Sequence, residues 1–225
     1  MPSYETLADV IEHLGGIDPR RVRASPQPGK ATEKDLLRLL DCGGRLYELV
    51  DGVLVEKVMG LQESAVGVDL STSLNLFVRQ HDLGMVAGAD GTLRLMPKLV
   101  RIPDVSFISW AQLPRHEYPS EPIPDLYPDL AVEVLSEGNT EGEMERKLKD
   151  YFLSGTRLVW FVDPEARTVQ VYTSPDDWVT LTERDTLDGG DVLPGFALPL
   201  KELFARVPRP KPRRRGNGSK RSPRR

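Results

Sequence analysis

The 225-residue sequence has few cysteine, histidine and aromatic residues, and it lacks a long apolar run. A single cysteine, Cys42, excludes an internal disulfide, and its setting beside two glycines favours an ordinary loop cysteine over a reactive thiol. The three histidines (His13, His81 and His116) lie in dissimilar segments without a partner at metal-binding spacing. This disfavours a histidine-based metal site and a Ser-His-Asp triad. No stretch approaches eighteen apolar residues, so no membrane-spanning helix is expected.

The first residues also lack the basic region and apolar run of a secretory signal. Together with the single cysteine, this favours a reducing cytoplasm. The length suits one domain with appendages, because a chain of this size buries a proper core. Aromatic residues make up only 7%, which argues against a sugar-binding platform. The use of Glu48 and Glu133 as a paired acid and base on a non-nucleic substrate, such as a glycoside, is therefore the least favoured hypothesis for the function.

Charge is divided unevenly along the chain. Residues 206–225 contain ten Lys and Arg and no acid, whereas residues 1–205 contain 20 basic and 34 acidic residues, a net charge of −14. The C-terminal tail is rich in Pro, Gly and Ser without apolar periodicity, so we expect it to be disordered. Such a segment either attracts nucleic acid through counter-ion release or acts as a solubilising or localising tail, and both interpretations stay open.

Apolar periodicity predicts an α/β fold with a mixed central sheet flanked by helices. Asp51-Gly52 between two β-rich arms predicts a hairpin over residues 45–58. Residues 129–135, 140–153 and 156–163 have the patterns of a strand, a helix and a strand, which predicts a parallel βαβ unit. Further helices are expected at residues 5–14, from 33 to about 40, 62–80 and 198–207, with further strands within 84–105 and at 105–109, 167–173 and 178–182.

Two carboxylates stand where buried strands are expected. Asp104 follows Pro103 at the start of "VSFIS", and Glu133 lies inside "DLAVEVLS". A buried, unpaired carboxylate is costly, so each needs a cation, a metal ion or a proton. The alternative is that Asp104 caps a turn and Glu133 points to solvent from an edge strand. A third acid in a predicted strand, Glu48, favours the first interpretation, because converging carboxylates bind divalent cations.

The helix predicted at residues 140–153 supplies a candidate cation. Thr140 and Glu143 have the spacing of a capping box. Glu143, Lys147 and Tyr151 recur every four residues and therefore share one face of the helix. Lys147 either reaches back toward Glu133, where it would stabilise charge on a phosphate, or forms a surface ion pair with Glu143.

Several motifs occur in a fixed order: "YELVDG" (47–52), "IPDVSFIS" (102–109), "PDLAVEVLS" (128–136), the spaced Glu143-Lys147-Tyr151, and "GTRLVWFVDP" (155–164). Over about residues 32–205 this pattern resembles the Uma2 family of restriction-endonuclease-like proteins. The resemblance implies a restriction-endonuclease-like core of the PD-(D/E)XK class around Mg²⁺, with Mn²⁺ as a substitute. It also implies Asp104 and Glu133 as metal ligands, Glu48 as an additional acid of the metal site, and Lys147 as the catalytic lysine.

The sequence departs from the family patterns at two positions. The general nuclease signature places the lysine two residues after the acid, where this chain has Leu135, whereas the Uma2-like pattern takes it from the following helix, which matches Lys147. Relatives often carry a histidine near the start of the helix after the hairpin, where this chain has Glu63. Glu63 is either an extra ligand or an acid favoured by the first turn of that helix.

The leading hypothesis from the sequence is a Mg²⁺-dependent endonuclease acting on DNA, with the basic tail holding the substrate loosely. The second hypothesis is a non-catalytic nuclease-like protein that binds nucleic acid or a partner within a mobile-element or defence system. The expected organisation is an N-terminal helical extension and linker (1–31), a restriction-endonuclease-like domain (32–205) and the basic tail (206–225). A homodimer is compatible with the sequence, although no residue requires one.

Overall fold

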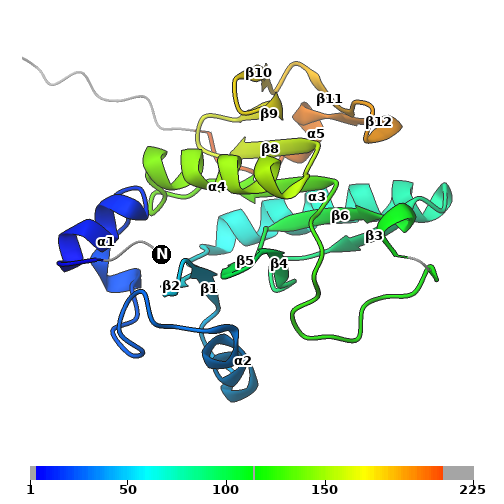
Figure 1. Cartoon of the computed structure of the whole chain (residues 1–225). Coiled ribbons are helices and arrows are strands. Elements are labelled where there is room, and N and C mark those ends of the chain that lie inside the picture. Colours follow the sequence, from blue (N-terminus) through cyan, green and yellow to red (C-terminus); the bar gives the residue numbers. More distant parts are fainter. Residues whose placement is uncertain (1–3, 114, 210–225) are drawn as a thin grey trace, which may run out of the picture.

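A computed structural model describes residues 4–113 and 115–209 (Figure 1). At its centre is a six-stranded mixed sheet with the strand order β10-β9-β8-β7-β6-β3. β7 and β8 pair in parallel, whereas the other neighbouring strands pair antiparallel. The strands are β3 (Gly84–Ala87), β6 (Val105–Ser109), β7 (Leu130–Val134), β8 (Leu158–Asp163), β9 (Thr168–Ser174) and β10 (Asp177–Thr182).

The parallel pair is joined by helix α4 (Glu141–Ser154), so the predicted strand-helix-strand unit is confirmed. Thr140 caps the helix by accepting a hydrogen bond from the Glu143 N–H at 3.1 Å. Gly155 ends the helix in the left-handed region, with φ at 111°, which glycine adopts without a steric cost. β7 and β8 are buried almost along their whole length, as expected for strands covered on both faces.

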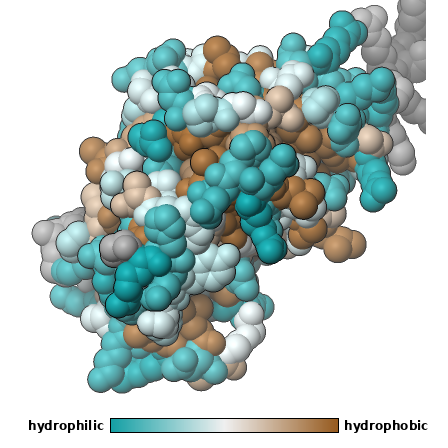
Figure 2. Space-filling view, turned by 90° about the vertical axis from the view of Figure 1, so that its right-hand side faces the viewer, coloured by the Kyte–Doolittle hydropathy of each residue, from teal (hydrophilic) through white to brown (hydrophobic). Residues whose placement is uncertain are grey.

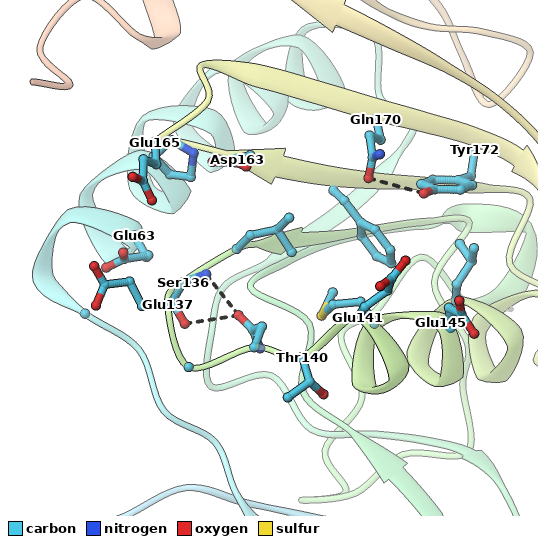
Figure 3. A pocket seen from close by; sticks show the side chains of 18 of the residues that line it. Glu63, Ser136, Glu137, Thr140, Glu141, Glu145, Asp163, Glu165, Gln170 and Tyr172 are labelled. Carbon is cyan, nitrogen blue, oxygen red and sulfur yellow. Dashed lines mark hydrogen bonds between the residues drawn. The ribbon is translucent and has the colours of Figure 1, made fainter. Parts of the chain in front are cut away.

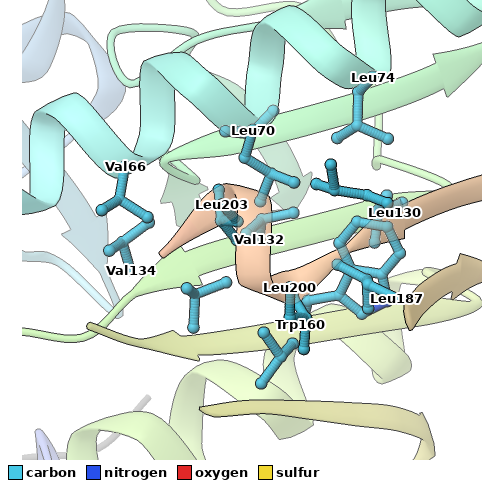
Figure 4. Close-up of a cluster of buried hydrophobic side chains, with 14 of the residues drawn as sticks. Val66, Leu70, Leu74, Leu130, Val132, Val134, Trp160, Leu187, Leu200 and Leu203 are labelled. Atoms are coloured by element: carbon cyan, nitrogen blue, oxygen red, sulfur yellow. The ribbon is translucent and has the colours of Figure 1, made fainter. Parts of the chain in front are cut away.

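One face of the six-stranded sheet is covered by helix α3 (Leu61–Gln80). Val66, Leu70 and Leu74 of this helix point toward the apolar side chains of the strands beneath (Figure 4). Leu130, Val132 and Val134 of β7 belong to this cluster, so every second residue of the strand faces α3. The intervening residues, Ala131 and Glu133, therefore face the opposite side.

That opposite side is covered by α4, by helix α1 (Leu7–His13) and by a second sheet with the order β2-β1-β5-β4. The predicted hairpin β1-β2 turns at Asp51 and Gly52, whose φ values of 49° and 82° are those of a type I′ turn. The hairpin lies outside the central sheet, so Glu48 belongs to a separate layer. The strands of this second sheet are β1 (Tyr47–Val50), β2 (Val53–Glu56), β4 (Leu93–Met96) and β5 (Leu99–Arg101).

The remaining elements lie at the periphery. Helix α2 (Glu33–Cys42) begins where a helix was predicted, and it starts with a capping box between Thr32 and Asp35. The hairpin of β11 (Thr186–Gly189) and β12 (Leu193–Pro199) was not predicted, and helix α5 (Leu200–Leu203) is shorter than the helix expected there. Two short 3₁₀ turns complete the described chain, η1 (Pro19–Arg21) and η2 (Trp110–Gln112).

The N-terminal segment packs on the rest of the molecule. Val10, Leu14 and Ile17 are buried in the same cluster as α4 and the second sheet. At the other end, Val207 is buried against the core, and the rest of the predicted tail, from residue 210, lies outside the described residues. The division of the chain at residues 32 and 206 therefore stays a prediction.

The face of the molecule in Figure 2 mixes hydrophilic and hydrophobic residues, and hydrophilic side chains interrupt the apolar ones. The expectation of a homodimer also stays a prediction. Among the described residues, no helix is both long and apolar enough to cross a membrane.

Candidate active site

Glu133 is buried, with 4% of its surface exposed, and it faces α4. Its Oε2 atom lies 2.9 Å from Nζ of Lys147, and its Oε1 atom accepts a hydrogen bond from the hydroxyl of Tyr151. Both partners come from α4, four residues apart, so one helix face supplies both contacts. The interpretation of Glu133 as a surface residue on an edge strand is therefore excluded.

Lys147 points inward, with 3% of its surface exposed. Besides Glu133, it contacts Oε1 of Glu48 at 3.4 Å. Burial disfavours the charged form of the lysine, but the carboxylates of Glu133 and Glu48 outweigh this effect and raise its pKa. Of the two orientations considered for Lys147, the structure has the inward one, toward Glu133.

Glu143 is the residue whose pairing differs from the sequence analysis. Its carboxylate binds the guanidinium of Arg21 through two hydrogen bonds of 2.8 and 2.6 Å, and neither Lys147 nor the Thr140 backbone is its partner. The capping box is therefore only half formed. Arg21 comes from the N-terminal segment, so a contact between distant parts of the chain replaces the expected local pair.

Glu48 reaches the same region from β1 in the second sheet. Its Oε2 lies 2.7 Å from Nη1 of Arg101, and its Oε1 accepts the Ile102 N–H at 3.1 Å. Burial would raise the pKa of Glu48, but the charges of Lys147, Arg101 and Lys57 outweigh it and hold the pKa at about 2. Glu48 is thus ionised at neutral pH in this environment.

Asp104 lies immediately before β6 and bridges toward the strand of Glu133. Its backbone N–H donates to the carbonyl of Val132 at 2.9 Å, and its Oδ2 accepts the Val134 N–H at 2.7 Å. Its other oxygen, Oδ1, lies 2.8 Å from Nζ of Lys57. The alternative role of Asp104 as a simple turn cap is excluded, because its partners lie on another strand and on a distant loop.

Sequence reasoning missed two of the cations in this cluster, Lys57 and Arg101. Arg101 is 3% exposed and also binds Asp150 of α4 through Nε at 3.1 Å. It stands in the apolar run "LVRI" directly before Pro103-Asp104, and a charge inside an apolar run was the signal that identified Glu133. Lys57 follows the hairpin arm "VLVE", where nothing in the local pattern indicates that its side chain turns inward.

We define the buried charge cluster as Glu48, Lys57, Arg101, Asp104, Glu133, Lys147 and Asp150. The pKa of Glu133 is raised by burial and by the negative charges of Asp104 and Glu48, against the opposing effect of Lys147. Ionic groups are costly to bury, and clusters with perturbed pKa values occur preferentially at functional sites. The four residues predicted from the sequence (Glu48, Asp104, Glu133 and Lys147) all belong to this cluster.

The donor chemistry of these acids fits a hard divalent cation, because Mg²⁺ prefers carboxylate oxygens. Asp104 and Glu133 come from adjoining strands, and Glu48 shares Lys147 with Glu133. Within the described residues, however, no three His, Cys, Asp or Glu side chains are arranged to hold a metal ion. Ammonium and guanidinium groups lie against the carboxylates, so a divalent cation requires a rearrangement of these side chains.

A separate surface groove lies between α4 and the strands β8 and β9, and it also borders the segment that follows β7 (Figure 3). Its volume is about 1090 Å³, and none of the residues of the buried charge cluster lines it. Glu63, which the sequence analysis considered as an extra ligand, lies on its wall with Glu137 and Glu141. Within the described residues, Glu63 makes no hydrogen bond to the buried charge cluster.

Comparisons with known proteins agree with this architecture. A solved structure described as a "putative nuclease belonging to DUF820 from Anabaena variabilis ATCC 29413" matches 77% of this chain and 97% of its own length, with a TM-score of 0.66 and 20% identity. At that identity the match shows the fold alone, which is a mixed α/β fold resembling that nuclease-like structure. A search of curated proteins gives no match.

The family follows from a second comparison. The Uma2 family model, described as "Putative restriction endonuclease", matches residues 34–201. The match covers most of the chain, so this protein belongs to the Uma2 family. The resemblance inferred from the motifs is thereby confirmed.

Proposed function

We propose that this protein is a Mg²⁺-dependent DNA endonuclease that hydrolyses phosphodiester bonds, with Mn²⁺ as an alternative metal. One observation carries the proposal: Lys147 contacts both Glu133 and Glu48, while Asp104 bonds to the strand that carries Glu133. The four residues expected to form a nuclease site thus belong to one cluster, although they come from four separate elements. Family membership supports the same class of reaction.

Asp104, Glu133 and Glu48 would hold the metal ion, which supplies a Lewis acid for the phosphate when it is bound. Glu133 is positioned for this by its strand and by Tyr151, and Asp104 by the Val134 N–H. Backbone and buried side chains thus fix where these acids lie, but the lysines and the arginine that pair with them must move before a metal ion binds.

Lys147 is a cation in this proposal and serves neither as a base nor as a metal ligand. An ordinary lysine is protonated at neutral pH, and the neighbouring carboxylates raise its pKa further. Its ammonium group therefore donates hydrogen bonds and stabilises negative charge that develops on a phosphate. Because Lys147 is 3% exposed, a substrate phosphate reaches it only after covering side chains move.

The basic segment 206–225 would add attraction to the DNA backbone that is independent of sequence. Residues 1–205 carry a net charge of −14, so the basic segment offsets the long-range repulsion between the rest of the protein and the DNA. Binding through it should weaken steeply as salt concentration rises.

The direct test incubates the full-length protein with supercoiled, linear and single-stranded DNA, in Mg²⁺, in Mn²⁺ and in EDTA. We expect metal-dependent cleavage by the wild type and a loss of about a hundredfold or more in Glu133→Gln, since one electrostatic group of a catalytic site is removed. Glu137→Gln is the matched control, because this acid is exposed and lies four residues along the chain. Binding of DNA without turnover under all conditions would overturn the proposal and favour the non-catalytic alternative.

A further inference from the structure

Lys57 is the member of the buried charge cluster whose surroundings most resemble a cation site. It directly follows β2, and its backbone N–H donates to the carbonyl of Leu46 at 2.9 Å, which continues the hairpin by one residue. Its side chain turns away from solvent, with 6% exposed. The charged end of a long, flexible side chain is therefore placed inside the protein, where a lysine is rarely found without a partner.

Three oxygen atoms surround the ammonium group of Lys57. Nζ lies 2.8 Å from Oδ1 of Asp104, and it donates hydrogen bonds to the carbonyls of Ile102 at 2.5 Å and Ala89 at 3.3 Å. One carboxylate and two backbone carbonyls are oxygen donors of the kind that hard cations use. Lys57 thus occupies an all-oxygen environment next to one of the acids assigned to the metal.

The charge of Lys57 also extends beyond Asp104. It contributes a lowering effect to the pKa of Glu48 and partly opposes the rise in the pKa of Glu133, although it forms no direct ion pair with either among the described contacts. Lys57 therefore acts on the same three acids that are assigned to the divalent ion. Two cations that neutralise the same carboxylates exclude each other by repulsion, and this effect is strong where water is scarce.

Building on the nuclease function proposed above, we propose that the Lys57 ammonium is the resident counter-ion of Asp104, and that a divalent cation binds by displacing it. The structure thus contains a cation of its own that keeps the buried acids paired until the metal binds. Releasing Lys57 from its oxygen partners costs free energy, and this cost weakens metal binding. The binding free energy reflects only the difference between the contacts that the metal gains and those that Lys57 loses.

The first experiment measures Mg²⁺ and Mn²⁺ affinity of the full-length protein by isothermal titration calorimetry. Lys57→Met removes the charge and keeps a flexible apolar stem, and Lys34→Met is the control on an exposed face of α2. We expect Lys57→Met to bind the metal about tenfold more tightly than the wild type, which corresponds to about 1.4 kcal/mol, and Lys34→Met to bind as the wild type does. Equal or weaker binding by Lys57→Met would overturn the inference and leave the proposed nuclease function standing.

A second measurement uses the wild type alone and does not depend on whether a variant folds. Acetylation of lysines by a water-soluble reagent, followed by mass spectrometry, reports the exposure of each ammonium group. We expect modification of Lys57 to rise when Mg²⁺ is added, while that of Lys34 stays constant. Unchanged modification of Lys57 at a Mg²⁺ concentration that saturates binding argues against displacement. Absence of any metal binding by the wild type would instead refute both this inference and the proposed function.

Discussion

The buried charge cluster and the surface groove both contain several carboxylates, but the negative charges are stabilised in different ways in the two places. In the cluster, Glu48, Asp104 and Glu133 each lie against a lysine or an arginine. In the groove, Glu137 and Glu141 are exposed and, within the described residues, form no ion pair. Water solvates the groove acids, whereas the cluster acids depend on protein cations because burial removes their solvent. The presence of several carboxylates alone therefore does not distinguish a buried charge cluster from a solvated surface.

A second contrast lies within the cluster itself. The pKa of Glu48 is held at about 2, whereas the pKa of Glu133 is raised. Burial acts on both in the same direction, and the difference comes from their neighbours. Glu48 has Lys147 and Arg101 in contact, while Glu133 has one lysine in contact and feels the negative charges of Asp104 and Glu48. The cluster is thus asymmetric in charge, with its surplus of negative charge near Glu133.

The largest effect is expected for Lys147→Ala, which removes the cation shared by Glu133 and Glu48. DNA cleavage should fall by about a hundredfold or more, with metal binding retained. The free energy of unfolding should fall by about 3–5 kcal/mol, because a buried pair loses one partner. Cleavage assays, metal titration and urea unfolding measure these three outcomes.

Lys149→Ala is the control for Lys147→Ala, since Lys149 is exposed on the same helix. It should leave cleavage unchanged. Full cleavage by a folded Lys147→Ala protein would show that the buried charge cluster is not the catalytic centre.

Glu48→Gln should weaken metal-dependent cleavage, because Glu48 is one of the proposed metal ligands, and it should have a smaller effect on stability that depends on pH. At pH 7 this variant leaves Arg101 and Lys147 without one carboxylate, so it should be less stable than the wild type by about 3 kcal/mol. The folded pKa of Glu48 lies below its ordinary value, so its contribution is complete above that ordinary pKa, about 4.3, and is lost as pH falls toward about 2. Urea unfolding at pH 7 and pH 3 should therefore show a smaller difference at pH 3. A difference that is independent of pH would contradict the charged role of Glu48.

The smallest effect is expected in the groove. Glu141→Gln removes an exposed acid that has no ion-pair partner in the described part of the chain, so the free energy of unfolding should change by no more than about 0.5 kcal/mol. Cleavage should also stay the same. A loss of activity comparable to that of Glu133→Gln would mean that the groove, and not the cluster, contains the reacting groups.

Local patterns along the chain predicted much of the fold. The Asp51-Gly52 turn, the apolar strand around Glu133 and the four-residue spacing of Lys147 and Tyr151 all appear as expected. The β11-β12 hairpin was missed because its strands contain glycine and proline and alternate only weakly. Its pairing is stabilised by packing against the core, and that contribution is not visible in a short window of sequence.

Taken alone, the sequence determined which residues share a face of one helix or strand. Period two along β7 separates Glu133 from its apolar neighbours, and period four along α4 aligns Lys147 with Tyr151. The tertiary structure decided which charges meet between elements. Glu143 binds Arg21, which lies 122 residues away, in place of Lys147, and Asp104 binds Lys57. The physical reason is that burial forces each charge to find the partner that the fold brings nearest, and sequence spacing does not record that distance.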